Sequence, residues 1–358
     1  MKHFICRAFG KYTVKAPTNI ALIKYWGKSN EDINLPLNSS ISLTVDIEQF
    51  FTQTTIELND EKNQLILNNE PAEITGRISR VINMLKSLTK PENLEKKIKI
   101  ESCNNFPTAA GMASSASGLA ALTFGLAKAY KVNISMEELS GIARLGSGSA
   151  SRSFFGGIVE WSAGDSHEKS IARQLYENSH WDELRLLVIL TDLEKKKISS
   201  TNAMKLNRKM LLERANERVP IRIENLKKAL EAKDFENLAK ITMEESDDLH
   251  YVIEAANVKY LNAKSEEIKK LIHGFNSQGI RAAYTFDAGP NPFILTRKQD
   301  INDLVSHLLI SLKLRSHNDL KLHGQLPNDP FLFLQSSATI PVFGIIESKI
   351  SRTGPILL

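Results

Sequence analysis

The glycines of this chain are concentrated in one region. Nine of its 18 glycines lie between residues 101 and 164, whereas residues 165–273 contain none. Glycine lets the backbone turn sharply or approach a ligand closely, so we expect residues 101–164 to carry ligand-binding loops. The glycine-free stretch has Pro220 as its only proline and is therefore predicted to be mostly regular structure. The distribution favours a site-bearing N-terminal half, followed by a C-terminal half that begins with helices.

Hydrophobic periodicity predicts a mixture of strands and helices. Apolar and polar residues alternate from Ile41 to Glu48, which is typical of a half-buried strand. Strict strand–helix–strand alternation is rare and the 358 residues suit two lobes, so we predict an α+β protein divided into residues 1–190 and 191–358. Further strands are expected at residues 54–58, 64–67 and 186–190, and helices around residues 78–85, 223–230 and 235–241.

Composition excludes several classes of protein. The two cysteines, Cys6 and Cys103, cannot form a disulfide framework or a four-cysteine zinc site, and the eight histidines lack zinc-ligand spacing. The net charge of +5 is too small to indicate nucleic-acid binding but suits a local anion site. No run reaches the about 18 apolar residues of a membrane span, and the N-terminus lacks the apolar region of a signal peptide. We therefore expect a cytoplasmic protein with no membrane partner.

A loop of small residues precedes a predicted helix at residues 107–118, with the sequence P-T-A-A-G-M-A-S-S-A-S-G. The free backbone N–H groups and the dipole at a helix N-terminus can hold phosphate. Ser114 and Ser115 add hydroxyls that can bind phosphate or ligate Mg²⁺. The alternative is close helix packing through small residues, because the loop matches neither common nucleotide-binding glycine motif.

Three further segments place charged or hydroxyl side chains beside turns. An apolar run at residues 16–28 ends in two lysines, a tyrosine and a tryptophan, which could bind an anion or be a strand end with snorkelling lysines. Residues 144–157 combine two arginines with four serines, either as an oxyanion or carboxylate cradle or as a solvated loop. Asp287 follows an apolar run and could act as a base or cap a turn. Together these features suit phosphoryl transfer to a small anionic substrate.

These same segments carry a resemblance to a known family. The chain reads A-P-T-N-I-A-L-I-K-Y-W-G-K, N-N-F-P-T-A-A-G-M-A-S-S-A-S-G, G-S-G-S-A-S-R-S and A-Y-T-F-D-A-G-P-N in this order. In these motifs it closely resembles the diphosphomevalonate decarboxylases of the GHMP kinase superfamily. The likeness runs from about residue 8 to residue 296. Ser151 stands where many relatives have cysteine, and Pro292 where alanine is common; neither change removes a proposed functional group.

The resemblance implies a two-lobe GHMP kinase fold, with a ribosomal-S5-domain-2-like N-terminal lobe and an α/β sandwich C-terminal lobe. It implies a homodimer that uses ATP and Mg²⁺ to phosphorylate the 3-hydroxyl of mevalonate 5-diphosphate. Loss of phosphate and CO₂ then yields isopentenyl diphosphate. The implied catalytic residues are Asn19, Lys28, Ser149, Arg152 and Asp287. The implied substrate-binding residues are Tyr25, Trp26, Gly27, Lys28, Arg77, Ser147, Gly148, Ser149, Ala150, Ser151, Arg152, Ser200, Thr201 and Met204. The implied ATP-binding residues are Pro107, Ala110, Gly111, Met112, Ala113, Ser114, Ser115 and Ser117, with Ser114 and Ser115 also near Mg²⁺.

Three alternative functions stay open at this point. A relative could act on mevalonate 5-phosphate or 3,5-bisphosphate, or it could phosphorylate without decarboxylating. The presence of Lys28, Arg152 and Asp287 argues against a kinase that does not decarboxylate. A nucleotide-binding regulator with this fold would have no need of Asp287. A nucleic-acid binder is the weakest alternative, because basic and aromatic residues are not interleaved along the chain.

Overall fold

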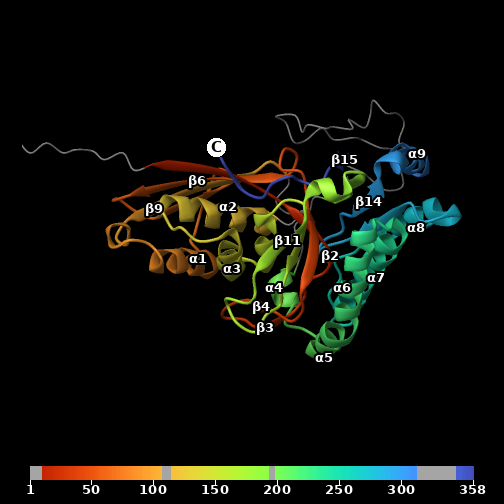
Figure 1. The fold of residues 1–358 in the computed structure, drawn as a ribbon, viewed down its shortest axis with the longest axis horizontal. Helices are drawn as coiled ribbons and strands as arrows, with labels where there is room; N and C mark the ends of the chain where they lie inside the picture. The colour runs from red at the N-terminus through yellow and green to blue at the C-terminus, as the bar shows by residue number, and fades with distance from the viewer. Residues whose placement is uncertain (1–9, 107–113, 193–197, 313–343) are drawn as a thin grey trace, which may run out of the picture.

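The computed structural model describes residues 10–106, 114–192, 198–312 and 344–358. The N-terminal half is built on a sheet of order β16-β1-β6-β9-β7-β8; helix α2 packs on its strands, and α1 and α3 pack against α2 (Figure 1). The strands are β1 (Lys11–Pro17), β6 (Phe51–Asn59), β7 (Gln64–Leu67), β8 (Glu70–Ala72), β9 (Lys97–Asn104) and β16 (Ile356–Leu357). The helices are α1 (Gly76–Ser87), α2 (Ser114–Ala129) and α3 (Met136–Gly146).

Two four-stranded sheets meet in a second core. One has the order β11-β10-β5-β2 and the other β13-β14-β12-β15, and their apolar side chains belong to one buried cluster. Helix α7 contacts both β2 and β13, so it joins the two sheets. The strands are β2 (Asn19–Ile23), β5 (Ser40–Thr44), β10 (Ile158–Trp161), β11 (Ala172–Tyr176), β12 (Leu184–Leu190), β13 (Ala282–Thr285), β14 (Phe293–Arg297) and β15 (Gly344–Ser348). The helices are α4 (Ser200–Ala203), α5 (Arg208–Glu213), α6 (Val219–Ala232), α7 (Phe235–Glu254), α8 (Ala263–Phe275) and α9 (Ile301–Ser311).

Most predicted elements are confirmed, and with them the α+β class. The glycine-free stretch is mainly helical, and α6 ends where Lys233 adopts a left-handed conformation and Asp234 caps α7. The division at residue 190 stays a prediction: β12 precedes it but pairs with β14 and β15. Among the described residues, no helix is long and apolar enough to cross a membrane.

The prediction of a half-buried strand at residues 41–48 is wrong. The strand is β5, it ends at Thr44, and all five of its residues are buried. Residues 148–154 lie against the strand, and two of its three buried hydroxyls hydrogen-bond to the backbone, which offsets the cost of burying them; the Ser42 hydroxyl has no partner among the described residues. Ser40 donates to the Ile23 carbonyl at 2.6 Å and Thr44 to the Phe155 carbonyl at 2.7 Å. Alternation alone could not separate such a strand from a solvent-facing one.

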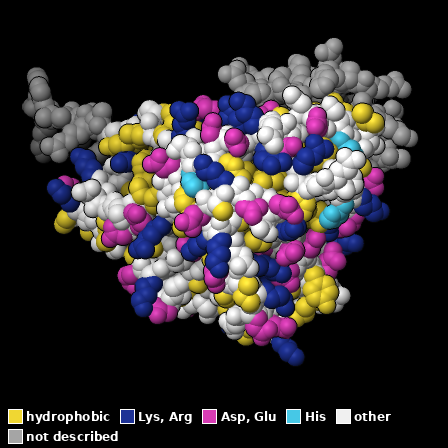
Figure 2. Space-filling view, turned by 45° about the vertical axis from the view of Figure 1, so that its right-hand side comes forward, with side chains coloured by type: hydrophobic (Ala, Val, Ile, Leu, Met, Phe, Trp, Pro, Cys, Tyr) yellow, Lys and Arg dark blue, Asp and Glu magenta, His cyan; other side chains and the backbone are white. Residues whose placement is uncertain are grey.

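Charges of both signs are interspersed over the face that Figure 2 shows. Exposed ion pairs along helices include Lys228 with Glu224 at 2.7 Å and Lys240 with Glu236 at 2.6 Å. Pairs of this kind contribute little to stability because water screens them. Stability therefore depends mainly on the two cores and on close backbone packing between segments.

The C-terminal segment packs against the backbone of the glycine-rich region, which generates a prediction. A Cβ at Gly156 would lie 2.3 Å from the Arg352 carbonyl carbon, so Gly156→Ala must displace main chain. We expect a loss of about 1–3 kcal/mol in the free energy of unfolding, measured by urea denaturation. Gly76→Ala is the control, because a Cβ there meets nothing within 4 Å. Equal midpoints for the two variants would contradict the packing described.

Candidate active site

A cleft of about 750 Å³ lies between the two halves of the chain. The N-terminal half contributes one wall, which consists of the chain that follows β2, helix α1, the start of α2 and residues 146–152. The C-terminal half contributes the opposite wall, from α4, α7 and the turn after β13. The chain therefore brings together motifs more than 250 residues apart. The predicted site residues that line this cleft are Tyr25, Trp26, Lys28, Arg77, Ser114, Ser115, Ser147, Gly148, Ser149, Arg152, Ser200, Thr201, Met204 and Asp287.

The other predicted residues lie behind the cleft or outside the described residues. Asn19 is buried beneath the 147–153 segment, and its amide donates to the Ser149 carbonyl at 3.0 Å and to the Ser153 hydroxyl at 2.8 Å. Ser117 points into the N-terminal core, where its hydroxyl lies 2.6 Å from that of Thr52. Gly27, Ala150 and Ser151 are buried. Pro107, Ala110, Gly111, Met112 and Ala113 fall outside the described residues.

Asp287 forms an ion pair with Lys24 across the two halves. The ammonium of Lys24 lies 2.8 Å from Oδ1 of Asp287, and the side chains are 2% and 26% exposed. Burial lowers the pKa of Lys24, while Asp287 and then Glu245 act to raise it. The pair thus presents a carboxylate to the cleft and fixes its orientation from behind.

Arg152 is a buried cation beside this pair. Its Nε donates to Asn19 at 3.3 Å, its guanidinium carbon lies 5.8 Å from the centre of the Trp161 ring, and its Nη1 has no hydrogen-bond partner among the described residues. Burial lowers the pKa of Arg152 to about 10, while Asp287 acts to raise it. Arg152 therefore stays charged at neutral pH, and its planar group is oriented before any ligand binds.

Tyr25 packs edge-on against Trp161, with ring centroids 4.7 Å apart. Its hydroxyl keeps its proton, because burial raises the pKa of Tyr25. Gly148 allows this arrangement: a Cβ at that position would lie 2.7 Å from atoms of both rings. A glycine is therefore required where the 147–152 segment passes the aromatic pair.

Basic side chains gather at Lys28, with Arg77 and Arg80 also lining the cleft. Burial lowers the pKa of Lys28, Glu31 acts to raise it, and Arg80 and Arg77 are among the cations that lower it. An anion bound here would relieve this repulsion between cations. Two contacts connect the region to the C-terminal half: Lys205 lies 2.5 Å from Glu31, and Arg208 donates to the Lys28 carbonyl at 3.0 Å.

The start of α2 could hold phosphate and Mg²⁺. Ser114 and Ser115 are the first two residues of this 16-residue helix, and both line the cleft. Ser115 and Ser147 have hydroxyl oxygens 3.3 Å apart, and Ser147 and Ser149 3.2 Å apart, so the helix start adjoins the cradle around Arg152. Magnesium usually keeps several waters and binds through substrate phosphates, so a helix start with two hydroxyls fits it. The described residues contain no group of three His, Cys, Asp or Glu that could hold a metal alone.

Comparison with known proteins decides the family. Residues 16–172 match the diphosphomevalonate decarboxylase-like N-terminal domain, and residues 186–340 match the mevalonate 5-diphosphate decarboxylase C-terminal domain. The chain belongs to the diphosphomevalonate decarboxylase family. It is 37% identical to the human diphosphomevalonate decarboxylase over 335 residues, which cover 87% of this chain and 83% of the human one. The family and the enzyme activity predicted from the sequence are thereby confirmed.

Solved structures of family members agree with the fold. The mevalonate diphosphate decarboxylase from Trypanosoma brucei superposes with a TM-score of 0.84 at 34% identity, covering 98% of each chain. MDDEF in complex with MVAPP, AMPPCP and magnesium superposes with a TM-score of 0.80 at 31% identity, covering 97% of this chain and 98% of that one. The prediction of a two-lobe GHMP kinase fold is confirmed.

Sequence reasoning missed several residues of the cleft. Lys24 is one of the two lysines that the sequence offered as anion ligands or as snorkelling side chains, and its ion pair with Asp287 was not predicted. The signal available was a lysine directly after the apolar run Ile20–Ile23. Arg80 lies one helical turn after Arg77, so helical spacing could have found it. Glu31, Asn34, Ser199 and Asn202 also line the cleft; no pattern in the sequence marked them.

Proposed function

We propose that this chain catalyses the ATP-dependent decarboxylation of mevalonate 5-diphosphate to isopentenyl diphosphate, CO₂, ADP and phosphate through a 3-phosphorylated intermediate. The observation that carries the proposal is the placement of Asp287, paired with Lys24, in one cleft with Arg152 and a cluster of basic side chains. The complex of MDDEF with MVAPP, AMPPCP and magnesium supports the choice of ligands.

Each part of the substrate has a matching region in the cleft. The diphosphate would bind the cluster of Tyr25, Lys28 and Arg77, to which we add Arg80. The carboxylate would bind the guanidinium of Arg152, which can donate two parallel hydrogen bonds without transferring a proton. Substrate orientation would come from Asn19, Ser147, Ser149, Ser200, Thr201 and Met204, with Trp26, Gly27, Gly148, Ala150 and Ser151 shaping the surrounding segments.

ATP would bind at the start of α2, with Mg²⁺ near Ser114 and Ser115 and with the 107–113 loop and Ser117 as further predicted contacts. When bound, Mg²⁺ would neutralise charge on the transferring phosphoryl group. Asp287 would orient the 3-hydroxyl and accept its proton. Lys24 would keep Asp287 fixed during this step, so the carboxylate need not reorganise.

The order of events follows from leaving-group chemistry. A tertiary hydroxyl leaves poorly, whereas phosphate leaves readily, so phosphorylation must come first. Arg152 would hold the carboxylate in its ionised form, which is the form that loses CO₂. The nearby phosphate groups would ease the positive charge developing at C3, because Asp287 is neutral once it holds the proton of the 3-hydroxyl.

A panel of substrates tests the proposal against its alternatives. Purified protein with ATP and Mg²⁺ should form ADP and CO₂ in equal amounts from mevalonate 5-diphosphate, and much less from mevalonate 5-phosphate or 3,5-bisphosphate. ADP without CO₂ would indicate a kinase, and neither product would indicate a binding protein. The cytoplasmic location and the homodimer remain predictions from the sequence.

Arg152→Lys should keep the positive charge but lose the planar group that donates two parallel hydrogen bonds. We expect CO₂ release to fall about tenfold or more, since hydrogen bonds to charged groups contribute about 1.5–3 kcal/mol. Arg173→Lys, at an exposed position of β11, is the matched control. Near-normal CO₂ release from Arg152→Lys would contradict the carboxylate role.

Asp287→Asn should keep the size of the side chain and remove its charge. ADP and CO₂ formation should fall together by roughly 10²–10⁴-fold, the range for loss of a general base, while ligand binding changes much less. The measurement is single-turnover ADP formation with a melting curve on the same sample, and exposed Asp165→Asn is the control. A lower melting temperature with normal turnover would show that Asp287 only stabilises its turn.

A further inference from the structure

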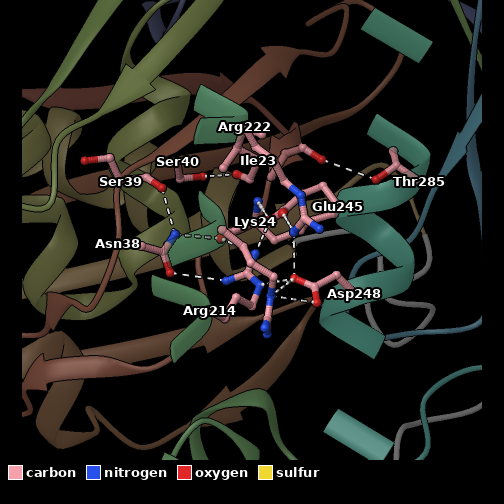
Figure 3. A network of polar contacts seen from close by, with 12 residues as sticks. Ile23, Lys24, Asn38, Ser39, Ser40, Arg214, Arg222, Glu245, Asp248 and Thr285 are labelled. Carbon is pink, nitrogen blue, oxygen red and sulfur yellow. Dashed lines mark hydrogen bonds and ion pairs between the residues drawn. The ribbon is translucent and has the colours of Figure 1, made fainter. Parts of the chain in front are cut away.

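A network of charged side chains adjoins the Lys24–Asp287 pair, and Figure 3 shows its members Lys24, Arg214, Arg222, Glu245 and Asp248. Arg214 and Glu245 are both 0% exposed and form an ion pair. Arg222 and Asp248 extend it: Arg222 lies 2.8 Å from Glu245 and 2.6 Å from Asp248. Arg218 also contacts Asp248 at 3.1 Å. Burying charges such as those of Lys24, Arg214 and Glu245 is costly and gives weak stabilisation compared with apolar packing, so another role for the network must be considered.

Glu245 and Arg214 contact the main chain of Lys24 directly. Oε1 of Glu245 accepts the N–H of Lys24 at 2.9 Å. The carbonyl of Lys24 accepts from Arg214 at 3.4 Å and from the Asn38 amide at 2.9 Å. Arg214 also donates to Oδ1 of Asn38 at 3.3 Å. Side chains from the C-terminal half thus bind both main-chain polar groups of the residue that pairs with Asp287.

Lys24 depends on these contacts because it lies at the end of a strand and not within one. Strand β2 ends at Ile23, and its pairing with β5 is irregular between Ala21 and Ile23. Lys24 therefore lies just beyond the regular ladder. We propose that Glu245 and Arg214 are positioning residues, which fix the main chain of Lys24 and so direct its ammonium at Asp287. The inference rests on the proposed function of Asp287.

Glu245 also acts on Lys24 through its charge. The groups that face Lys24 are Asp287 from the turn after β13, Glu245 and His250 from α7, Arg152 from the 148–154 segment and Arg214 from the helical segment between α5 and α6. His250 is neutral, because burial lowers its pKa to about 3. Without the charge of Glu245, the pKa of Lys24 would fall further. Lys24 would then lose its proton at a lower pH, and activity would begin to decline at that lower pH.

The first test is Glu245→Gln, which keeps the side-chain volume and removes the charge. We expect kcat to fall by about 10- to 100-fold, in line with the effect of a misplaced catalytic group. KM should change little, and the alkaline limb of the pH profile of kcat should move to lower pH. Glu244→Gln, the exposed neighbour on α7, is the control and should match the wild type. A folded Glu245→Gln with wild-type kcat and alkaline limb would overturn the proposal.

A paired variant separates positioning from stability. Arg214→Met with Glu245→Leu replaces the buried ions by apolar side chains, which often preserves or raises stability. We expect a folded protein with kcat still reduced by about 100-fold, and with Lys24 shifted away from Asp287 in its crystal structure. Normal kcat, or retention of the 2.8 Å contact, would show that the network only stabilises the fold.

Failure of the proposed function can be distinguished from failure of the positioning role. If the wild-type chain forms no CO₂ from mevalonate 5-diphosphate, the substrate assignment is wrong. The crystal structure of the paired variant would then still test whether Arg214 and Glu245 direct Lys24 at Asp287.

Discussion

The ion pair between Lys24 and Asp287 joins two segments that are 263 residues apart in the sequence, and the rest of the site is arranged around it. Lys24 follows β2 of the N-terminal half, and Asp287 follows β13 of the C-terminal half. The two sheets share one apolar core, and within it a buried ammonium left without a carboxylate would be strongly destabilising, so Lys24 and Asp287 must meet where the halves pack. Once they meet in this way, Arg152 and the basic cluster around Lys28 face the same cleft as Asp287.

Small residues make this arrangement possible. Gly148 leaves room for Tyr25 and Trp161, and Gly156 lets the C-terminal segment pack on the backbone of the N-terminal half. At both glycines the absence of a side chain permits close packing between segments, whereas the sequence predicted access of ligands to the backbone. Composition alone could not separate these two roles of glycine, because both require the absence of a Cβ.

Much of the fold and the site could be predicted from the sequence, since local patterns carry the information. Periodicity located β7, α1 and α7, and the motifs located Arg152 and Asp287. Contacts between distant segments left no such pattern. Nothing in the sequence indicates that Glu245 binds the main chain of Lys24, which lies 221 residues earlier. The buried hydroxyl face of β5 was missed for the same reason, because alternation does not tell which elements cover a strand.

The central claim is that Asp287, oriented by Lys24, acts on the 3-hydroxyl of the substrate. A crystal structure of the chain with mevalonate 5-diphosphate tests it most directly. The account predicts a carboxylate oxygen of Asp287 within about 2.6–3.2 Å of the 3-hydroxyl oxygen, with Lys24 still paired to Asp287 and the substrate carboxylate on Arg152. A substrate bound in the cleft with its 3-hydroxyl turned away from Asp287 would contradict the account.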